Sequence, residues 1–195
     1  MNPIISIQNL QFKFDRNNLF ENFSLTINKG DKVGICGKNG SGKSTLLRLM
    51  LKIYQSNSVF LKEKIKICQI LNPNVGLNIH LTVIENIKRI FYLMNIPIQI
   101  DDKLNQIIDL VNLQPYINKR TSALSQGYKL RIFFVIFFYE NFDLIVMDEY
   151  VSFGDGELSN KIKHQFDDKL KNSTLVLASH NDKFLKLFCN KIIYL

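Results

Sequence analysis

The sequence lacks any apolar run long enough to cross a lipid bilayer. Its longest uninterrupted run, "IFFVIFFY" at residues 132–139, has eight residues and is flanked by Arg131 and Glu140. A membrane-spanning helix needs about 20 residues. The stretch "MNPIISIQNL" at the start shows no basic leader followed by a long apolar segment, so we expect no secretion signal. These absences predict a cytoplasmic protein. If it binds a membrane, we expect it to bind peripherally at the inner face.

Patterns typical of metal binding are also missing. The three cysteines, Cys36, Cys68 and Cys189, stand far apart, and each lies among apolar neighbours. Their spacing does not fit a zinc site, so we expect three buried free thiols. The three histidines do not cluster either.

Neither composition nor charge singles out a partner. The 195 residues are 46% hydrophobic and 22% charged, which is ordinary for a soluble globular protein and most simply predicts one domain. The formal net charge of +8 permits an anionic partner, but no run of five or more basic residues occurs. We therefore interpret the lysines as solvated surface charge and expect no nucleic acid partner.

Short strands alternate with helical segments along the chain. Apolar and polar residues alternate in "IISIQNLQFKF" at residues 4–14, as in a half-buried strand. "KVGIC" at 32–36, "LIVM" at 144–147 and "STLVLAS" at 173–179 are continuously apolar, which is typical of strands buried on both faces of a sheet. Residues 81–139 have mostly helical periodicity. The sequence therefore predicts an α/β domain.

A glycine-rich loop follows one of these apolar strands. Residues 37–44, "GKNGSGKS", fit the pattern G-x-x-x-x-G-K-[ST] at every fixed position, and the segment "STLLRLML" that follows has helical periodicity. Glycine lets the backbone curl so that its N–H groups point at phosphate oxygens, and the helix adds its positive end. We expect Lys43 to reach the β- and γ-phosphates and Ser44 to hold Mg²⁺. This predicts a nucleotide site, which kinases, GTPases and ATPases share.

Two acidic residues end a later strand. In "FDLIVMDEY" the apolar residues 144–147 lead directly to Asp148 and Glu149. A carboxylate at a strand end beside such a loop can hold Mg²⁺ through water, and a second one can polarise an attacking water. The pair therefore favours a site that hydrolyses nucleotide.

The segment "LSQGY" at residues 124–128 resembles the signature L-S-G-G-Q of the ATP-binding cassette (ABC) ATPases. Residues 37–44 resemble the family's Walker A motif, "DEYVSFGD" at 148–155 its Walker B and D-loop segments, and His180 its switch histidine. The resemblance extends over essentially the whole chain. It implies a P-loop NTPase (RecA-like) α/β core with an N-terminal antiparallel β part and a helical subdomain inserted at about residues 78–140.

The resemblance also implies catalytic and metal-binding roles. It makes Glu149 the residue that orients the attacking water, His180 the residue that contacts the γ-phosphate, and Lys43 the third member of the catalytic set. Taken alone, a histidine such as His180 at the end of an apolar strand is more often structural. The Mg²⁺ ligands that the resemblance implies are Ser44, Gln69 and Asp148.

ATP contacts are implied in the same way. Phe14 lies where the family stacks an aromatic ring on adenine, with Phe12 as the fallback, although an aromatic strand residue often serves packing. Gln69 occupies the place of the family's Q-loop, although it could simply be a polar residue at a strand end. The ATP-binding residues implied are Phe14, Gly37, Lys38, Asn39, Gly40, Ser41, Gly42, Lys43, Ser44, Thr45, Gln69, Ser125, Gly127 and Asp155.

Two positions depart from the family's signature. Gln126 replaces its first glycine and Tyr128 its terminal glutamine, while Ser125 and Gly127 are kept. In the family the signature serine and its amides bind the γ-phosphate of ATP on the opposite subunit. We expect that contact to be retained. The effect of Gln126 and Tyr128 on the rate of ATP turnover is left open by the sequence.

The resemblance implies a homodimer that closes on two ATP molecules, docked on a separate transmembrane permease at the inner face of the cell membrane. "NPNVGLNIHLTVIENI" at residues 72–87 and "SFGDGELSNK" at 152–161 are similar to segments of capsule, O-antigen and teichoic acid exporters. We therefore expect an ATPase that powers polysaccharide export.

Other functions fit less of the sequence. The ATPase of a haem or lipid exporter is the alternative within transport. A soluble ABC ATPase acting on nucleic acid or ribosomes lacks support, because no coiled-coil insertion separates the motifs and no second cassette follows. A P-loop small-molecule kinase would leave residues 124–128, Asp155 and His180 without roles.

Overall fold

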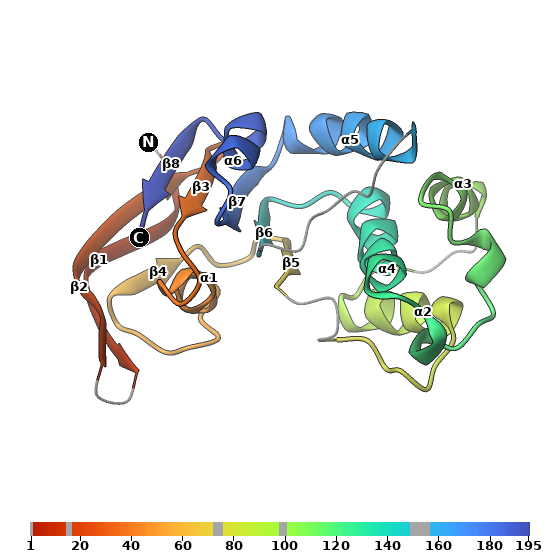
Figure 1. Ribbon diagram of the computed structural model, residues 1–195, viewed down its shortest axis with the longest axis horizontal. Helices are drawn as coiled ribbons and strands as arrows, with labels where there is room; N and C mark the ends of the chain where they lie inside the picture. The colour runs from red at the N-terminus through yellow and green to blue at the C-terminus, as the bar shows by residue number, and fades with distance from the viewer. Residues whose placement is uncertain (1, 15–16, 72–75, 98–100, 149–156) are drawn as a thin grey trace. The chain divides into compact units, whose positions relative to one another are not determined.

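A computed structural model describes residues 2–14, 17–71, 76–97, 101–148 and 157–195 (Figure 1). The chain divides into two compact units. Unit 1 consists of Met1–Leu71, Phe142–Glu149 and Leu170–Leu195, and unit 2 of Asn72–Asn141 and Tyr150–Lys169.

Unit 1 begins with an antiparallel sheet of three strands in the order β2-β1-β4. Strands β1 (Pro3–Phe14) and β2 (Asn17–Asn28) are long, whereas β4 (Val59–Leu61) has only three residues. The alternating pattern of the sequence directs Ile5 and Ile7 of β1 into the core, where both are almost fully buried. This is the N-terminal antiparallel part that the family resemblance implies.

The second sheet of unit 1 has five strands, all parallel, in the order β5-β6-β7-β3-β8. Its central strands β6, β7 and β3 are buried along nearly their whole length, as their continuous apolar sequence predicts. The strands are β3 (Lys32–Cys36), β5 (Ile67–Ile70), β6 (Leu144–Met147), β7 (Thr174–Ser179) and β8 (Lys191–Tyr194).

Two helices of unit 1 pack beside these strands. Helix α1 (Lys43–Met50) buries Leu46, Leu47 and Met50 in a core shared with both sheets. Helix α6 (Asp182–Phe188) lies against β3. A Cβ at Gly34 would lie only 3.3 Å from Leu185 of α6, so a glycine there allows the helix to approach the strand closely.

The described part of unit 2 is helical. It contains helix α5 except for the last residue of that helix, which belongs to unit 1. Helix α4 contacts both α2 and α3 and buries aromatic residues around its circumference, and its Phe137 packs on Phe166 of α5 with ring centroids 5.1 Å apart. The elements are α2 (Val83–Leu93), α3 (Asp102–Leu110), the 3-10 helices η1 (Gln114–Tyr116) and η2 (Thr121–Ala123), α4 (Gln126–Tyr139) and α5 (Glu157–Leu170).

Side-chain hydrogen bonds define where the helices of unit 2 begin. Thr82 and Glu85 form a reciprocal capping box at the start of α2, and Asp101 caps α3. Asn86, fully buried on α2, donates to Thr121 Oγ1 over 2.8 Å and so connects this helix to η2. Buried polar groups of this kind are stable only when they are paired.

The α/β fold predicted from the sequence is confirmed, and one cysteine differs from its expectation. Cys36 and Cys68 are buried free thiols, whereas Cys189 is only half-buried because it lies just after α6, where the chain turns into the edge strand β8. Within the described ranges, no helix combines the length and apolar character that a bilayer span requires.

Candidate active site

The glycine-rich loop joins β3 to α1 and has the curled backbone that its sequence predicts. Gly40 and Gly42 adopt positive φ angles of 83° and 98°, a backbone conformation that residues with a Cβ atom rarely adopt. Gly42 is also the N-cap residue of α1. At Gly37 a Cβ would overlap Ser41 Oγ and lie 3.1 Å from the backbone oxygen of Leu195. Glycine is therefore required at these positions for two different reasons, backbone conformation and close approach.

The Lys43 side chain lies inside the curled loop. Its side chain is 6% exposed, and its ammonium donates hydrogen bonds to the carbonyl oxygens of Gly37 (2.8 Å) and Lys38 (3.0 Å). Both acceptors belong to the loop itself, so the ammonium lies in the mouth of the loop. A lysine in this position can transfer its hydrogen bonds to phosphate oxygens.

Ser44 and Asp148 converge on one point from positions 104 residues apart. The Ser44 hydroxyl donates to Asp148 Oδ2 over 2.5 Å, and Asp148 is 8% exposed. One hydroxyl and one buried carboxylate beside a phosphate-binding loop form the hard-oxygen donor set that Mg²⁺ prefers. These two residues therefore fit the metal role given to them by the sequence. Among the described residues no group of three or more His, Cys, Asp and Glu side chains lies close enough together to hold a metal.

Three neighbouring strands bring the polar residues together. In the order β6-β7-β3, Asp148 follows β6, His180 follows β7, and the glycine loop follows β3. All three strands are parallel, so these residues share the carboxyl edge of the sheet, where α/β folds bind their ligands. This topology explains why residues far apart in the sequence form one site.

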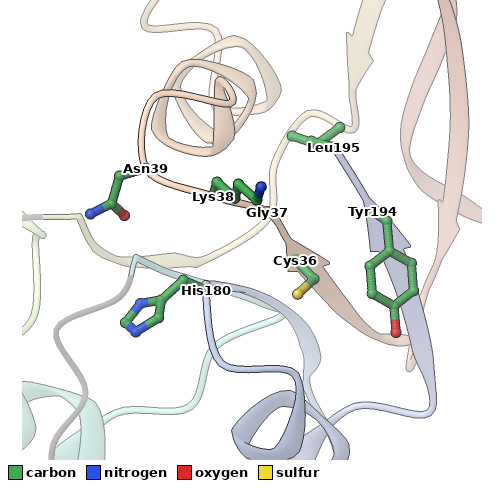
Figure 2. A pocket seen from close by; sticks show the side chains of 7 residues that line it. All are labelled: Cys36, Gly37, Lys38, Asn39, His180, Tyr194 and Leu195. Carbon is green, nitrogen blue, oxygen red and sulfur yellow. The ribbon is translucent and has the colours of Figure 1, made fainter.

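His180 lines a pocket of about 610 Å³ beside the loop. Figure 2 shows the side chains of the pocket wall, with His180 coming from the end of β7 and Cys36 and Tyr194 from β3 and β8. Gly37, Lys38, Asn39 and Leu195 complete the wall. His180 is exposed and lies beside the loop, and its contact to a terminal phosphate stays a prediction.

A charged cluster stands beside this pocket. Asp182 accepts hydrogen bonds from Tyr194 (2.6 Å) and from the Lys186 ammonium (2.5 Å). The hydrogen bond from Lys186, followed by the one from Tyr194, lowers the pKa of Asp182. The bond to Asp182 in turn raises the pKa of Lys186. The cluster holds the end of β8 against the start of α6.

A second pocket, of about 480 Å³, opens beside the start of α1. One part of its wall is the loop and the first turn of the helix, including Gly40, Gly42, Lys43, Ser44 and Thr45, together with Asn39. The other part consists of Leu19, Arg48 and Tyr54. This pocket therefore joins the predicted phosphate site to an apolar and aromatic surface.

The predicted signature lies in unit 2. Ser125 is the N-cap residue of α4, and both Ser125 and Gly127 are exposed. Tyr128, which replaces the family's glutamine, packs on Tyr116 with centroids 4.3 Å apart, and the Arg131 guanidinium lies 4.3 Å from its ring centroid. The substitution thus adds an aromatic and cationic stack behind the exposed end of the helix.

Several predicted residues remain without a structural assignment. Glu149 and Asp155 lie outside the described residues, and so does the side chain of Phe14 at the end of β1. Gln69 is exposed, lies opposite Val146 on β6, and stands one residue before the end of β5. Its metal-binding role stays a prediction.

Sequence reasoning did not identify part of both pocket walls. Arg48 lies one helical turn beyond Ser44, and this four-residue spacing was an available signal. Leu19 and Tyr54 reach the second pocket from β2 and from the segment after α1, and Tyr194 reaches the first from β8. Only tertiary packing brings these residues to the loop.

Comparison with known proteins agrees with this geometry. The family model described as ABC transporter matches residues 20–152. The chain is 27% identical to the capsule polysaccharide export ATP-binding protein CtrD of Neisseria meningitidis serogroup B, over 91% of this chain and 81% of that protein. It is 35% identical to the teichoic acids export ATP-binding protein TagH of Bacillus cereus over 89% of this chain, but it spans only 32% of TagH.

The fold is shared with solved ATP-binding cassettes. One of them, described as a dimer in a post-hydrolysis state bound to ADP and Pi, superposes with a TM-score of 0.78 at 21% identity, covering 98% of this chain and 94% of that one. The family match covers more than half of the chain and includes the glycine loop and Asp148. The chain therefore belongs to the ABC transporter family and carries its ATP-binding and ATP-hydrolysing domain.

Proposed function

We propose that this chain binds MgATP at the carboxyl edge of its parallel sheet and uses ATP hydrolysis to power export of a polysaccharide through a separate membrane subunit. The hydrogen bond between Ser44 and Asp148 at the glycine loop is the observation that carries the nucleotide part of this proposal. The export part is supported by relatives named for capsule polysaccharide and teichoic acid export. It also rests on the two similar sequence segments at residues 72–87 and 152–161.

In this proposal the loop binds the phosphates and Lys43 neutralises them. The Lys43 ammonium exchanges its contacts with the Gly37 and Lys38 carbonyls for the β- and γ-phosphate oxygens. Ser44 and Asp148 hold Mg²⁺, with Gln69 as a further ligand. When bound, the metal neutralises charge that develops on the phosphate oxygens.

Glu149 and His180 act on the terminal phosphate. Glu149 directly follows Asp148, so we assign it the role of orienting water for in-line attack. His180, at the end of β7 beside the loop, contacts the γ-phosphate. Asp148, the residue before Glu149, and His180 follow adjacent parallel strands, which supports the carboxyl edge of the sheet as the reacting edge.

A second copy of the chain completes the site. We assign Ser125 and Gly127, both exposed at the start of α4, to the γ-phosphate bound by the opposite copy. Asp155 lies at the same interface in this proposal. The dimer docks on a transmembrane permease at the inner face of the cell membrane, and the helical segment of residues 81–120 transmits its movement.

The test is deletion of the gene in the organism that encodes it, followed by measurement of surface polysaccharide. We expect surface polysaccharide to fall and to accumulate inside the cell, and the parent gene but not Lys43→Ala to restore export. Unchanged surface polysaccharide in the deletion strain would overturn the export proposal. A loss of haem or lipid export instead would identify a different cargo.

A further inference from the structure

The first turn of α4 has little local stabilisation. Ser125 is its N-cap residue, but within the described part of the chain the Ser125 side chain forms no capping hydrogen bond. Gly127 lies in the same turn, is exposed and is a poor helix former. The first turn also contains no acidic side chain that would compensate the positive end of the helix. A tertiary contact is therefore needed to fix the position of this turn.

Tyr128 supplies such a contact. Residues 125–127 are all exposed, whereas Tyr128 is half-buried. Its ring packs on the ring of Tyr116, with 4.3 Å between the centroids and 46° between the planes. Tyr116 is the last residue of η1, so the contact joins the start of α4 to a different segment of unit 2.

Two cations contact this pair of rings. The Arg131 guanidinium lies 4.3 Å from the centroid of the Tyr128 ring, and the Lys119 ammonium lies 4.7 Å from the centroid of the Tyr116 ring. A cation over the face of an aromatic ring is attracted by the electrons of the ring. We refer to Tyr116, Lys119, Tyr128 and Arg131 together as the signature cluster.

Hydrogen bonds anchor the two cationic members of the cluster. Arg131 donates from Nη1 to the carbonyl oxygen of Val111, the C-cap residue of α3, over 3.3 Å. The N–H group of Val83, in the first turn of α2, donates to the carbonyl oxygen of Lys119 over 3.1 Å. The contacts of Tyr128 therefore connect the first turn of α4 to the end of α3 and to the start of α2.

We propose that Tyr128 is a positioning residue for ATP hydrolysis. Through its contact with Tyr116, it holds the start of α4 in the geometry that presents residues 125–127 to the γ-phosphate bound by the opposite copy. A turn that is already held loses less backbone freedom when the two copies meet, which favours closure of the dimer. This inference rests on the proposed function, since it needs that second copy. Glutamine, which the family has at this position, has no ring for such a contact.

The experiment separates dimer closure from nucleotide binding by one copy. ATP turnover per chain is measured over a range of concentrations of the full chain, because a site completed by a second copy is active only in the dimer. The protein concentration at half-maximal turnover then reports closure. The dissociation constant of MgADP, which has no γ-phosphate, is measured by calorimetry and reports the glycine loop alone. Urea unfolding reports stability.

The variants are Tyr128→Leu, Tyr116→Leu, the two combined, and Tyr128→Phe. Tyr139→Leu is the matched control, because Tyr139 is also half-buried and lies at the other end of the same helix. It makes the same kinds of contact, with the Phe91 ring (4.8 Å between centroids) and with the Lys103 ammonium (4.4 Å from its ring centroid). The control therefore removes an aromatic and cationic contact from α4 without changing its first turn.

Loss of one aromatic pair corresponds to about a 2- to 13-fold change in an equilibrium constant. A closed dimer contains two such helix starts, so Tyr128→Leu and Tyr116→Leu should reach half-maximal turnover at about 5- to 150-fold higher protein concentration. The double variant should match the single variants, because all three lack the same contact. Tyr128→Phe should behave like the parent. Tyr139→Leu should be destabilised in urea but should keep the parental concentration dependence, and all variants should bind MgADP like the parent.

Three results would overturn the proposal. The first is parental concentration dependence in Tyr128→Leu. The second is an equal shift in Tyr139→Leu, because the effect would then follow from lost stability of α4 as a whole. The third is a loss of MgADP affinity in Tyr128→Leu as large as its shift in protein concentration.

Ser125→Ala tests the proposed function separately. If turnover of the parent does not depend on protein concentration, or if Ser125→Ala has the parental dependence, the site shared by two copies fails and the positioning role fails with it. If Ser125→Ala is shifted while Tyr128→Leu is not, only the positioning role of Tyr128 fails. The two failures are therefore distinguishable.

Discussion

Substitution of Gly37 by alanine tests the shape of the loop most sharply. A Cβ at this position would overlap Ser41 Oγ and would lie 3.2 Å from Ser41 Cβ and 3.1 Å from the backbone oxygen of Leu195. The last two distances require small shifts, but the overlap with Oγ requires the Ser41 side chain or the loop to move. Ser41 Oγ is buried, so it has little free space to move into, and we expect the loop backbone to shift with it.

Forcing an extra carbon into a packed site costs about 1–3 kcal/mol. If the strain falls on the conformation that binds nucleotide, Gly37→Ala should weaken MgATP binding by about 5- to 150-fold. The double variant Gly37→Ala/Ser41→Ala removes the overlapping oxygen and should recover most of this loss. Ser41 Oγ has no hydrogen-bond partner among the described residues, so its removal sacrifices no bond within that part of the chain.

The assay is calorimetric titration of MgATP into the parent, both single variants and the double variant, which together form a double-mutant cycle. Urea unfolding of the same four proteins tests whether the fold is retained. Parental MgATP affinity in Gly37→Ala would refute the reasoning. Equal affinities of Gly37→Ala and the double variant would show that the Ser41 contact is not the cause.

Three other predictions follow from the site and the core. Glu149→Gln should lower ATP turnover roughly 10²- to 10⁴-fold and keep ATP binding, so an ATP-dependent dimer should accumulate on size-exclusion chromatography; parental turnover would remove Glu149 from its role. Ser44→Ala removes the hydroxyl that we assign to Mg²⁺ and should weaken ATP binding at least about tenfold with Mg²⁺ present but little in EDTA. Burial raises the pKa of the Cys68 thiol from 9.0 to about 12. The folded state therefore favours the protonated thiol, and its stability falls as the pH rises from about 9 toward 12. Between pH 8 and pH 10 the parent should lose about 1.4 kcal/mol more unfolding free energy than Cys68→Ala, and equal losses in urea titrations would contradict this.

The sequence predicts those parts of the site that are local in the chain. The strand, loop and helix around residues 32–50 follow from a short, mainly apolar stretch, a glycine-rich segment and a helical repeat, and the structure confirms all three. The polar ends of β6 and β7 are also predictable, because a parallel sheet places all such ends at one edge. Local rules are sufficient here because the residues act through backbone geometry.

Part of the wall of the second pocket was not predictable in the same way. Tyr54 lies in an irregular segment after α1, and its approach to Leu19 and Phe12 depends on how β1, β2 and α1 pack in the core. The exposure of Cys189 is another example. Its apolar neighbours favour burial, but it lies between a short helix and an edge strand, where one side faces solvent.

The central claim is that the curled loop and Lys43 bind the phosphates of ATP. The most direct test is calorimetric titration of MgATP into the parent and Lys43→Ala, with Lys88→Ala as the control, since Lys88 is an exposed lysine of α2 outside the predicted site and its removal changes the net charge equally. We predict one ATP bound per parent chain and at least about 30-fold weaker binding in Lys43→Ala, the effect expected when one partner of a buried charge contact is removed. Undiminished MgATP affinity in Lys43→Ala would contradict the account.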